Sequence, residues 1–285
     1  MTGSTPKIIL ATRKSPLALK QADLASSVLA EKMGMVVETL PLSTTGDQKM
    51  EWSLEKEGGK GLFTKELEVA LLEGHADVAV HSAKDLPTEM PAGLALAGYL
   101  PREDPRDVLV LRTDVVAPEV IATGSPRRRA QLLATHWPDA QMKEIRGNVG
   151  TRLRKIAENH EADATVLAAA GLLRLGITDF PGLRFEFLPI EKMVPAPGQA
   201  AIALQVRESD LSKFQPVCHE DTASAVDFER AVLATMGGGC QVAVGVHRKG
   251  NDLFIFHKED YVRIDLSGLS YSSALERALA VFENK

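Results

Sequence analysis

The sequence predicts an α/β protein made of two βα domains and a small α+β C-terminal domain. Short apolar strands alternate with amphipathic helices over the first two thirds of the 285 residues, which is the pattern of βα units. At a soft average of ~150 residues per domain, this length indicates two domains or three small ones. After about residue 217 the alternation gives way to a helix, three short strands and a last helix. A third, smaller domain is therefore expected there.

The first βα series begins with an apolar strand at residues 8–12 and a helix that opens at Ser15-Pro16. Serine is a favoured N-cap and proline a favoured first helical residue, so this dipeptide marks a helix start. Further strands are expected at residues 36–42, 76–81 and 94–100, and a helix at 64–73. The charged stretch PREDPRD at residues 101–107 is interpreted as a domain junction.

A second βα series follows this junction. Its expected strands are residues 108–111, 120–123, 142–145 and 162–166, and its helices begin at Ser125-Pro126, Thr151 and Ala168. The apolar strand at 200–206 is expected to return to the first domain, which makes a clam with two hinges. The predicted domains are residues 1–101 with a return segment 197–216, residues 102–196, and residues 217–285.

Composition and charge exclude several classes of function. A formal net charge of −5, a pI near 5.9 and 5% aromatic residues argue against a nucleic-acid partner. No run approaches the roughly 18 apolar residues of a membrane span, and the N-terminal apolar stretch is too short for a signal peptide. Two cysteines are too few for a disulfide framework and lack metal-site spacing. We expect a cytoplasmic protein without metal, nucleic acid or membrane partners.

Basic residues stand where several strands give way to helices. Arg13 and Lys14 precede one helix, residues 127–129 are three arginines at the start of another, and Arg146 and Arg152 flank a third start. Cations at a helix N-terminus cost a few tenths to ~1 kcal/mol each, because the helix dipole is positive there. The repetition indicates an anionic ligand between these side chains. Since arginine suits bidentate carboxylates, a polycarboxylate is favoured over the alternative, a solvated surface of arginines.

Two further motifs carry residues of catalytic type. Lys84-Asp85 follows a buried-type strand, which is where α/β sheets place ligands, so Asp85 is a candidate for acid/base work or for stabilising a cation. The alternative is a structural ion pair. Cys240 follows three glycines, whose backbone freedom allows a thiol to be presented as a nucleophile or attachment point. A lone cysteine is otherwise a small buried hydrophobe, which is the interpretation kept for Cys218.

Six motifs in order resemble one family, the hydroxymethylbilane synthases, also called porphobilinogen deaminases. They are ATRKSPLA from Ala11, GKGLFTKELE from Gly59, HSAKDLP from His81, REDPRD from Arg102, RGNVGTRL from Arg146, and Glu229-Arg230 followed by GGCQV from Gly238. The match spans roughly residues 8 to 247.

The resemblance implies two periplasmic-binding-protein-like domains and a third domain with a dipyrromethane cofactor, linked by a thioether to Cys240. It implies a transferase that joins four porphobilinogen molecules on this primer and releases hydroxymethylbilane and ammonia, a step of tetrapyrrole, porphyrin and heme biosynthesis. Asp85 would contact the pyrrole N–H groups and stabilise the cation formed when ammonia leaves. The residues implied to hold carboxylates of cofactor and growing chain are Arg13, Ser15, Lys84, Ser125, Arg127, Arg128, Arg146 and Arg152. Lys56 and Lys60 would belong to a loop beside the site, and a monomer is expected.

Three positions depart from the family's pattern. Ala200 stands where glycine is common, Pro126 where leucine is common and Ala243 where proline is usual. Proline suits a first helical turn. Ala200 is expected to narrow or stiffen the site, and Ala243 to alter the turn that presents Cys240.

Three other functions fit parts of the sequence. A carboxylate or oxyanion binder without catalysis explains the two βα lobes and the arginines, but not a glycine-presented cysteine in an added domain. A thiol hydrolase would pair Cys240 with His219 or His247, although no motif orients either base. A family member without catalysis is disfavoured because the motif residues are retained. A covalent pyrrole adduct would separate the enzyme from the first two.

Overall fold

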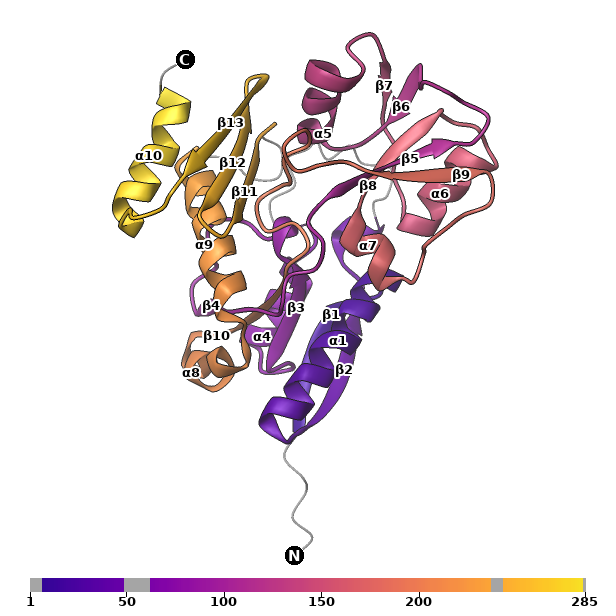
Figure 1. Cartoon of the computed structure of the whole chain (residues 1–285). Helices are drawn as coiled ribbons and strands as arrows, with labels where there is room; N and C mark the ends of the chain where they lie inside the picture. The colour runs from indigo at the N-terminus through magenta and orange to yellow at the C-terminus, as the bar shows by residue number, and fades with distance from the viewer. Residues whose placement is uncertain (1–6, 49–61, 237–242, 284–285) are drawn as a thin grey trace, which may run out of the picture.

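The computed structural model describes residues 7–48, 62–236 and 243–283. Its first unit is a five-stranded sheet in the order β2-β1-β3-β10-β4 (Figure 1). The strands are β1 (Lys7–Arg13), β2 (Val36–Leu42), β3 (Val78–Ser82), β4 (Leu94–Tyr99) and β10 (Ile202–Arg207). β1 pairs in parallel with β2 and β3, whereas β10 runs antiparallel to β3 and β4. A strand from late in the chain therefore lies between two early strands.

Helices cover both faces of this first sheet. They are α1 (Pro16–Met33), α2 (Thr45–Gln48), α4 (Lys65–Leu72) and α8 (Leu211–Phe214), with short 3-10 turns at Ala83–Asp85, Glu208–Asp210 and Gln215–Val217. Leu29 of α1 packs with Ile8 and Leu10 in one core, and Leu67 of α4 packs with Ala11 in a second core. Apolar residues at helical spacing thus meet the two faces of β1, whose side chains alternate.

The second unit repeats this arrangement, with a sheet in the order β7-β6-β8-β5-β9. Its strands are β5 (Asp107–Arg112), β6 (Val120–Ala122), β7 (Gln141–Lys143), β8 (Ala164–Ala168) and β9 (Leu183–Phe187). Its helices are α5 (Pro126–Gln131), a π-helical turn at Leu132–His136, α6 (Val149–Ala157) and α7 (Ala169–Arg174). β6 is parallel to β7 and β8, and β5 is antiparallel to β8 and β9.

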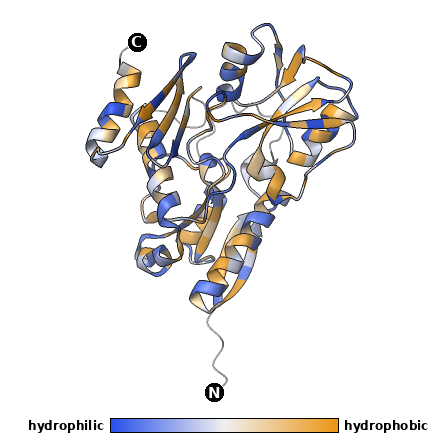
Figure 2. Ribbon diagram, viewed as in Figure 1, coloured by the Kyte–Doolittle hydropathy of each residue, from blue (hydrophilic) through white to orange (hydrophobic). Residues whose placement is uncertain are grey.

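The third unit is a three-stranded antiparallel sheet with a helix at each end of its sequence. The elements are α9 (Glu220–Thr235), β11 (Gly245–Lys249), β12 (Asp252–His257), β13 (Asp260–Asp265) and α10 (Tyr271–Glu283). Phe228 of α9, Ile255 of β12 and Ala278 of α10 share one core. Figure 2 shows that strands in all three units are largely hydrophobic, whereas the helices carry mixed faces. Within the described ranges, no helix has the length and hydropathy to cross a membrane.

Apolar contacts join the third unit to both of the others. Val226 of α9 packs with Tyr99 of the first sheet, and Phe254 and Phe256 of β12 pack with Val194, which leads back from the second sheet. The third unit therefore rests on the region where the chain passes between the sheets, beside both larger units (Figure 1). This placement brings α9 and β11, which flank Cys240 in sequence, close to the crossing chain.

The α/β fold class with a small C-terminal α+β unit is confirmed, with differences in detail. Each large sheet is mixed rather than largely parallel, because β5 and β10 run against their neighbours. β9 was not expected, and its RFEF core has too few residues to distinguish a strand from a loop by pattern alone. The exact domain limits at residues 101, 196 and 216 stay a prediction.

Two crossing segments, residues 100–106 and 188–201, connect the two large sheets. Two residues of the second segment adopt the left-handed backbone region: Gly198 with φ 71° and Ala200 with φ 72°. A Cβ on Gly198 would lie 3.2 Å from the Lys84 nitrogen, a tight contact at a positive φ, so this position favours glycine against the turn that carries Lys84 and Asp85. Ala200 has a Cβ in a conformation that costs L-residues about 1–2 kcal/mol.

We predict that Ala200→Gly raises the free energy of unfolding by about 0.5–1 kcal/mol. Relief of the left-handed strain exceeds the extra chain entropy that glycine gives the unfolded state. The matched control is Ala203→Gly in β10, where φ is negative, and there the same change should lower stability by about 1 kcal/mol. Urea unfolding of both variants measures the signs. An Ala200→Gly protein less stable than wild type would contradict the strain argument.

Candidate active site

The first sheet places two predicted motifs at one edge. β1 ends at Arg13 and the parallel neighbour β3 ends at Ser82, directly before the turn with Lys84 and Asp85. Carboxyl ends of parallel neighbours lie at the same edge, so the motifs meet although they are 70 residues apart. The Arg13 guanidinium lies 4.3 Å from the ring centroid of Phe63. Asp85 is exposed and Lys84 is half-buried.

Both predicted serine caps are present. The Ser15 Oγ accepts a hydrogen bond from the Ala18 amide at 3.3 Å, and the Ser125 Oγ accepts one from the Arg128 amide at 3.4 Å. Each serine is followed by a proline in the first turn. Pro126 is therefore accommodated as expected. The two serines fix where α1 and α5 begin, and each hydroxyl proton stays directed away from the amide that it caps.

Arg127 and Arg128 are buried, at 4% and 7% exposure, and converge on the fully buried carboxylate of Asp107. Arg127 Nη1 lies 2.7 Å from Asp107 Oδ2. Arg128 donates from Nε and Nη2 to Asp107 Oδ1 at 3.0 and 2.8 Å. Burial acts to raise the pKa of Asp107, but the two guanidinium charges outweigh it and hold that pKa far below its ordinary value. These arginines are thus not surface residues, and they share a resident anion, Asp107.

Lys84 brings the first sheet's residues into electrostatic contact with these arginines. Burial, together with the charges of Arg128 and Arg127, lowers the pKa of Lys84 from 10.5 to about 8, although Asp85 and Asp107 oppose the shift. A lysine with this pKa is still charged below pH 8. Because Arg128 and Asp107 act on the pKa of Lys84, the carboxyl edge of the first sheet lies near the start of α5.

Arg152 completes the group from α6. Its Nε donates to the Gly147 carbonyl at 2.7 Å, which orients the guanidinium across the start of the helix. Burial together with the charges of Arg128 and Arg146 lowers the pKa of Arg152 to about 10, and Asp85 opposes this. Arg146 is half-buried just before α6. Arg128, Arg146 and Arg152 of the second unit therefore lie near one another, and Asp85 of the first unit interacts with Arg128 and Arg152.

We call the five side chains of Lys84, Arg127, Arg128, Arg146 and Arg152 the cationic cluster. Two carboxylates interact with it, Asp107 buried beneath and Asp85 exposed beside it. Among the described residues these five cationic side chains outnumber the two carboxylates, in a protein whose overall charge is −5. A region of this kind attracts a ligand with several negative charges. Lys56, Lys60 and Cys240 lie outside the described residues.

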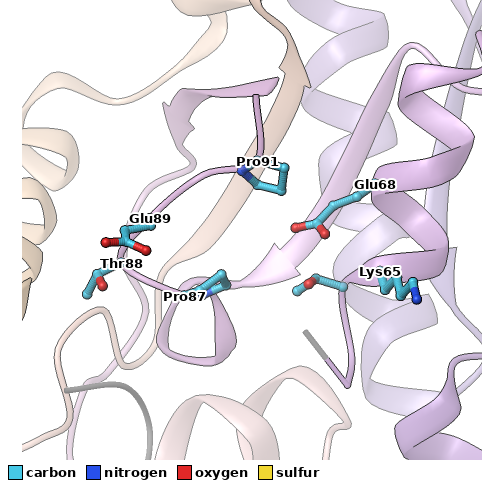
Figure 3. A pocket seen from close by; sticks show the side chains of 7 residues that line it. Lys65, Glu68, Pro87, Thr88, Glu89 and Pro91 are labelled. Atoms are coloured by element: carbon cyan, nitrogen blue, oxygen red, sulfur yellow. The ribbon is translucent and has the colours of Figure 1, made fainter. Parts of the chain in front are cut away.

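A pocket of about 280 Å³ adjoins the Asp85 turn (Figure 3). Figure 3 shows it between the start of α4 and the segment that follows Asp85. Its lining residues are Thr64, Lys65, Glu68, Pro87, Thr88, Glu89 and Pro91. A second cavity, of about 540 Å³, lies where both crossing segments meet β11. Neither is lined by the cationic cluster, so space for small molecules exists beside the candidate site and at the crossing chain.

Glu229 of α9 is a second buried carboxylate, and it joins the three units. Arg102 of the first crossing segment donates to both of its oxygens, at 2.7 and 3.1 Å. The Gly198 amide of the second segment donates at 2.8 Å, and so does the Arg248 amide of β11. His247 Nδ1 lies 3.2 Å from Oε1. Burial opposes ionisation, but Arg102 and His247 together lower the pKa of Glu229 from 4.5 to about 2.

The residues of the hydrolase alternative have structural contacts in this protein. The His219 ring nitrogen caps α9 by accepting from the Thr222 amide at 3.2 Å, and His247 faces Glu229. Cys218 packs against Gly98, where a Cβ would come within 2.8 Å of its Sγ, and burial raises its pKa to about 11. A thiol of this kind is unreactive at neutral pH. No group of three or more metal-ligating side chains occurs in the part of the chain that the structure describes.

Sequence reasoning missed Asp107, Gln199 and Glu229 as site residues. Gln199 Nε2 donates to the Pro105 carbonyl at 2.7 Å and to Asp107 Oδ1 at 3.1 Å. Asp107 stood in a charged stretch that was interpreted as a junction, and nothing local in the sequence marks it as a partner of residues twenty positions later. The available signal was compositional: buried arginines require a buried anion.

Solved structures with this general shape have low sequence identity to the chain. A double mutant of the BvgS VFT2 domain from Bordetella pertussis is 20% identical over 77% of this chain and 91% of its own, with a TM-score of 0.45. A substrate-binding protein of an amino acid ABC transporter is 16% identical over 81% and 95%, with a TM-score of 0.42. An OxyR mutant from Corynebacterium glutamicum is 16% identical over 83% and 69%, with a TM-score of 0.46.

The sequence profile "Porphobilinogen deaminase, dipyromethane cofactor binding domain" matches residues 8–214. This range is well over half of the 285 residues and contains every member of the cationic cluster together with Asp85 and Asp107. The matched region is the part of the family that binds the dipyrromethane cofactor of tetrapyrrole biosynthesis. The chain therefore belongs to the porphobilinogen deaminase family.

Proposed function

We propose that this protein is a hydroxymethylbilane synthase, a transferase that joins four porphobilinogen molecules in line, releases one ammonia per molecule, and frees the linear tetrapyrrole by hydrolysis. One observation carries the proposal. Five cationic side chains from two units lie within electrostatic reach of one another, and three of them, Lys84, Arg128 and Arg152, also interact with the exposed carboxylate of Asp85. Pyrroles with acetate and propionate side chains offer the carboxylates that a concentration of arginine and lysine side chains attracts and that the arginine fork suits.

The residues present also fit the family's dipyrromethane cofactor. The positive charges of the cationic cluster suit the carboxylate side chains of the cofactor. The Asp85 carboxylate is exposed, whereas that of Asp107 is fully buried. The residues proposed to hold the carboxylates are Arg13, Ser15, Lys84, Ser125, Arg127, Arg128, Arg146 and Arg152. We propose Cys240 as the attachment point, through a thioether. When bound, the cofactor supplies the pyrrole on which the first porphobilinogen is placed.

The roles of the chain's own residues follow from their charges. Loss of ammonia from porphobilinogen leaves a delocalised cation, and the fixed negative charge of Asp85 favours that state more than the neutral substrate. Asp85 also accepts from pyrrole N–H groups, which places the ring. Lys84 and the four arginines bind carboxylates equally before and after ammonia leaves, so they contribute affinity and orientation rather than a change in barrier.

The attachment site is tested by the intact mass of the purified protein beside Cys240→Ala and Cys218→Ala. Cys218 provides a matched control, since its thiol is packed against Gly98 with a pKa raised to about 11. We expect wild type and Cys218→Ala to carry a mass excess equal to two linked pyrroles, and Cys240→Ala to lack it and all turnover. Absence of the adduct from wild type even after incubation with porphobilinogen would contradict the proposed function and favour a non-catalytic carboxylate binder.

A further inference from the structure

We infer that Asp107 is a positioning residue of this site: its carboxylate holds Arg127 and Arg128 in the orientation in which they receive the ligand's carboxylates. The inference rests on the proposed function and goes beyond it, since it assigns the placement of the arginines to a residue that cannot reach the ligand. Asp107 has no exposed surface. Its effect on the reaction therefore passes through the arginines.

The contacts define a fixed geometry for each guanidinium. Arg128 is held on three sides, with Nε and Nη2 on Asp107 Oδ1 and Nη1 on the Val166 carbonyl at 2.8 Å. Arg127 Nη1 lies 2.7 Å from both Asp107 Oδ2 and the Val194 carbonyl. The planar fork of an arginine with one edge anchored presents its other edge in a set direction. Asp107 and two backbone carbonyls thus determine which N–H groups remain for a ligand.

Asp107 also connects this geometry to the crossing segments. Gln199 of the second segment donates to Asp107 Oδ1, and its Oε1 lies 3.4 Å from Arg127 Nη2. The Gln199 side chain also donates to the Pro105 carbonyl of the first segment, and the main-chain carbonyl of Gln199 accepts from Arg102 Nε at 2.9 Å. The arginines are therefore oriented relative to the chain that joins the two sheets, which also carries Gly198 against the Lys84 turn.

Two effects of removing the Asp107 charge have opposite signs. Loss of a negative charge beneath the cationic cluster raises the local positive potential and by itself strengthens the binding of an anion. In Asp107→Asn, the side-chain NH₂ group takes the place of the carboxylate oxygen that contacts Arg127. Two N–H donors then face each other, so the Arg127 guanidinium moves from its present direction. A misdirected guanidinium loses directional, charge-assisted hydrogen bonds to the ligand's carboxylate, and we expect this loss to exceed the electrostatic gain. We therefore expect net loss of substrate binding.

The test compares cofactor-loaded wild type with Asp107→Asn and Asp107→Glu, with Asp104→Asn as the matched control. Asp104 makes the same type of pair, at 2.6 Å to Arg106, but away from the cluster and partly exposed. In Asp107→Asn we expect KM for porphobilinogen to rise at least about tenfold, with kcat changed by less than about threefold, because uniform binding is lost. Asp107→Glu should recover part of the KM, and Asp104→Asn should match wild type.

A second readout needs no turnover. The pH dependence of Lys84 acetylation, followed by competitive labelling with acetic anhydride and peptide mass spectrometry, reports the pKa of this lysine. Asp107 favours the charged form of Lys84, so its removal should shift the labelling midpoint of about 8 to lower pH by about half a pH unit or more. Asp104→Asn should leave the midpoint in place. Asp107→Glu keeps the negative charge and should therefore keep the wild-type midpoint. This variant lets the labelling test the charge of Asp107 even if Asp107→Asn loses activity through instability.

The outcomes separate the two proposals. A wild type without pyrrole adduct or turnover overturns the proposed function, whatever the variants do. An active wild type with an unchanged or lowered KM in Asp107→Asn overturns the positioning role and shows that charge alone governs binding. An unchanged Lys84 midpoint overturns the electrostatic link between Asp107 and the site. A raised KM with a lowered midpoint supports the inference.

Discussion

Replacement of Asp85 by asparagine is expected to lower turnover at least about 100-fold while the fold and the covalent cofactor remain. Asp85 is an exposed residue of the turn that follows β3, so the change to an amide of equal size leaves the buried neighbours Ala83 and Leu86 in place. An asparagine still accepts one hydrogen bond, but it lacks the charge that favours a cation over neutral substrate. Loss of one preorganised group that acts on developing charge costs about 10²–10³ in rate.

Asp23→Asn is the matched control for this substitution, since Asp23 is exposed on α1, and its variant should turn over at the wild-type rate. Release of hydroxymethylbilane and ammonia from porphobilinogen, normalised to adduct-loaded protein by intact mass, gives turnover per active molecule. An Asp85→Asn protein that carries the adduct and retains more than about a third of wild-type turnover would remove Asp85 from the proposed role, because stabilisation of a cation by charge predicts a far larger loss.

The fold could be predicted from the sequence to the extent that local patterns determine it. Strand β2 was placed at its observed limits, and both Ser-Pro helix starts were found because capping chemistry involves only neighbouring residues. Strand direction was not predictable in the same way. Whether β5 and β10 run with or against their neighbours depends on how the chain crosses between two sheets, and the alternation of apolar residues is identical in both cases.

The sequence predicted which cationic residues belong to the candidate site, but it did not predict which carboxylates they contact. The prediction that Arg127 and Arg128 bind an anionic ligand stays a prediction, and the structure shows a protein anion, Asp107, as their resident partner. A sequence shows how many cationic residues a segment has. It does not show which carboxylate neutralises them, because that residue comes from a different element of the fold. Ala200 illustrates the other limit. Its departure from glycine was visible, but the strain at φ 72° follows only from the observed backbone.

Asp107 and Glu229 have the same kind of structural role at two places where segments of the chain meet. Each is a fully buried carboxylate that takes charged donors from different parts of the chain, and each has a pKa held below its ordinary value. Gln199 connects them: its main-chain carbonyl accepts from Arg102, and its side-chain amide donates to Asp107. A continuous buried polar path therefore runs from α9 through both crossing segments to α5. Such a path makes the relative placement of the three units depend on two ionised carboxylates.

We predict that Glu229→Gln lowers the free energy of unfolding by about 3–5 kcal/mol at neutral pH. The variant leaves Arg102, whose side chain is only 11% exposed, without its counter-charge, and it replaces one acceptor with a donor that faces backbone N–H groups. Glu38→Gln is the matched control, since its pair with Lys7 is more than half exposed, and a loss below about 1 kcal/mol is expected there. Urea unfolding of the three proteins at pH 7 measures both effects.

The pH dependence of the same comparison identifies the charge as the cause. The pKa of Glu229 is lowered from 4.5 to about 2, so its stabilisation is complete above pH 4.5 and is lost as pH falls toward 2. The stability difference between wild type and Glu229→Gln should therefore be constant from pH 7 to about 5 and should narrow below 4.5, because protonated glutamate resembles glutamine in charge. A difference that stays constant down to pH 3.5 would show that side-chain shape, and not the buried charge, joins α9 to the crossing segments.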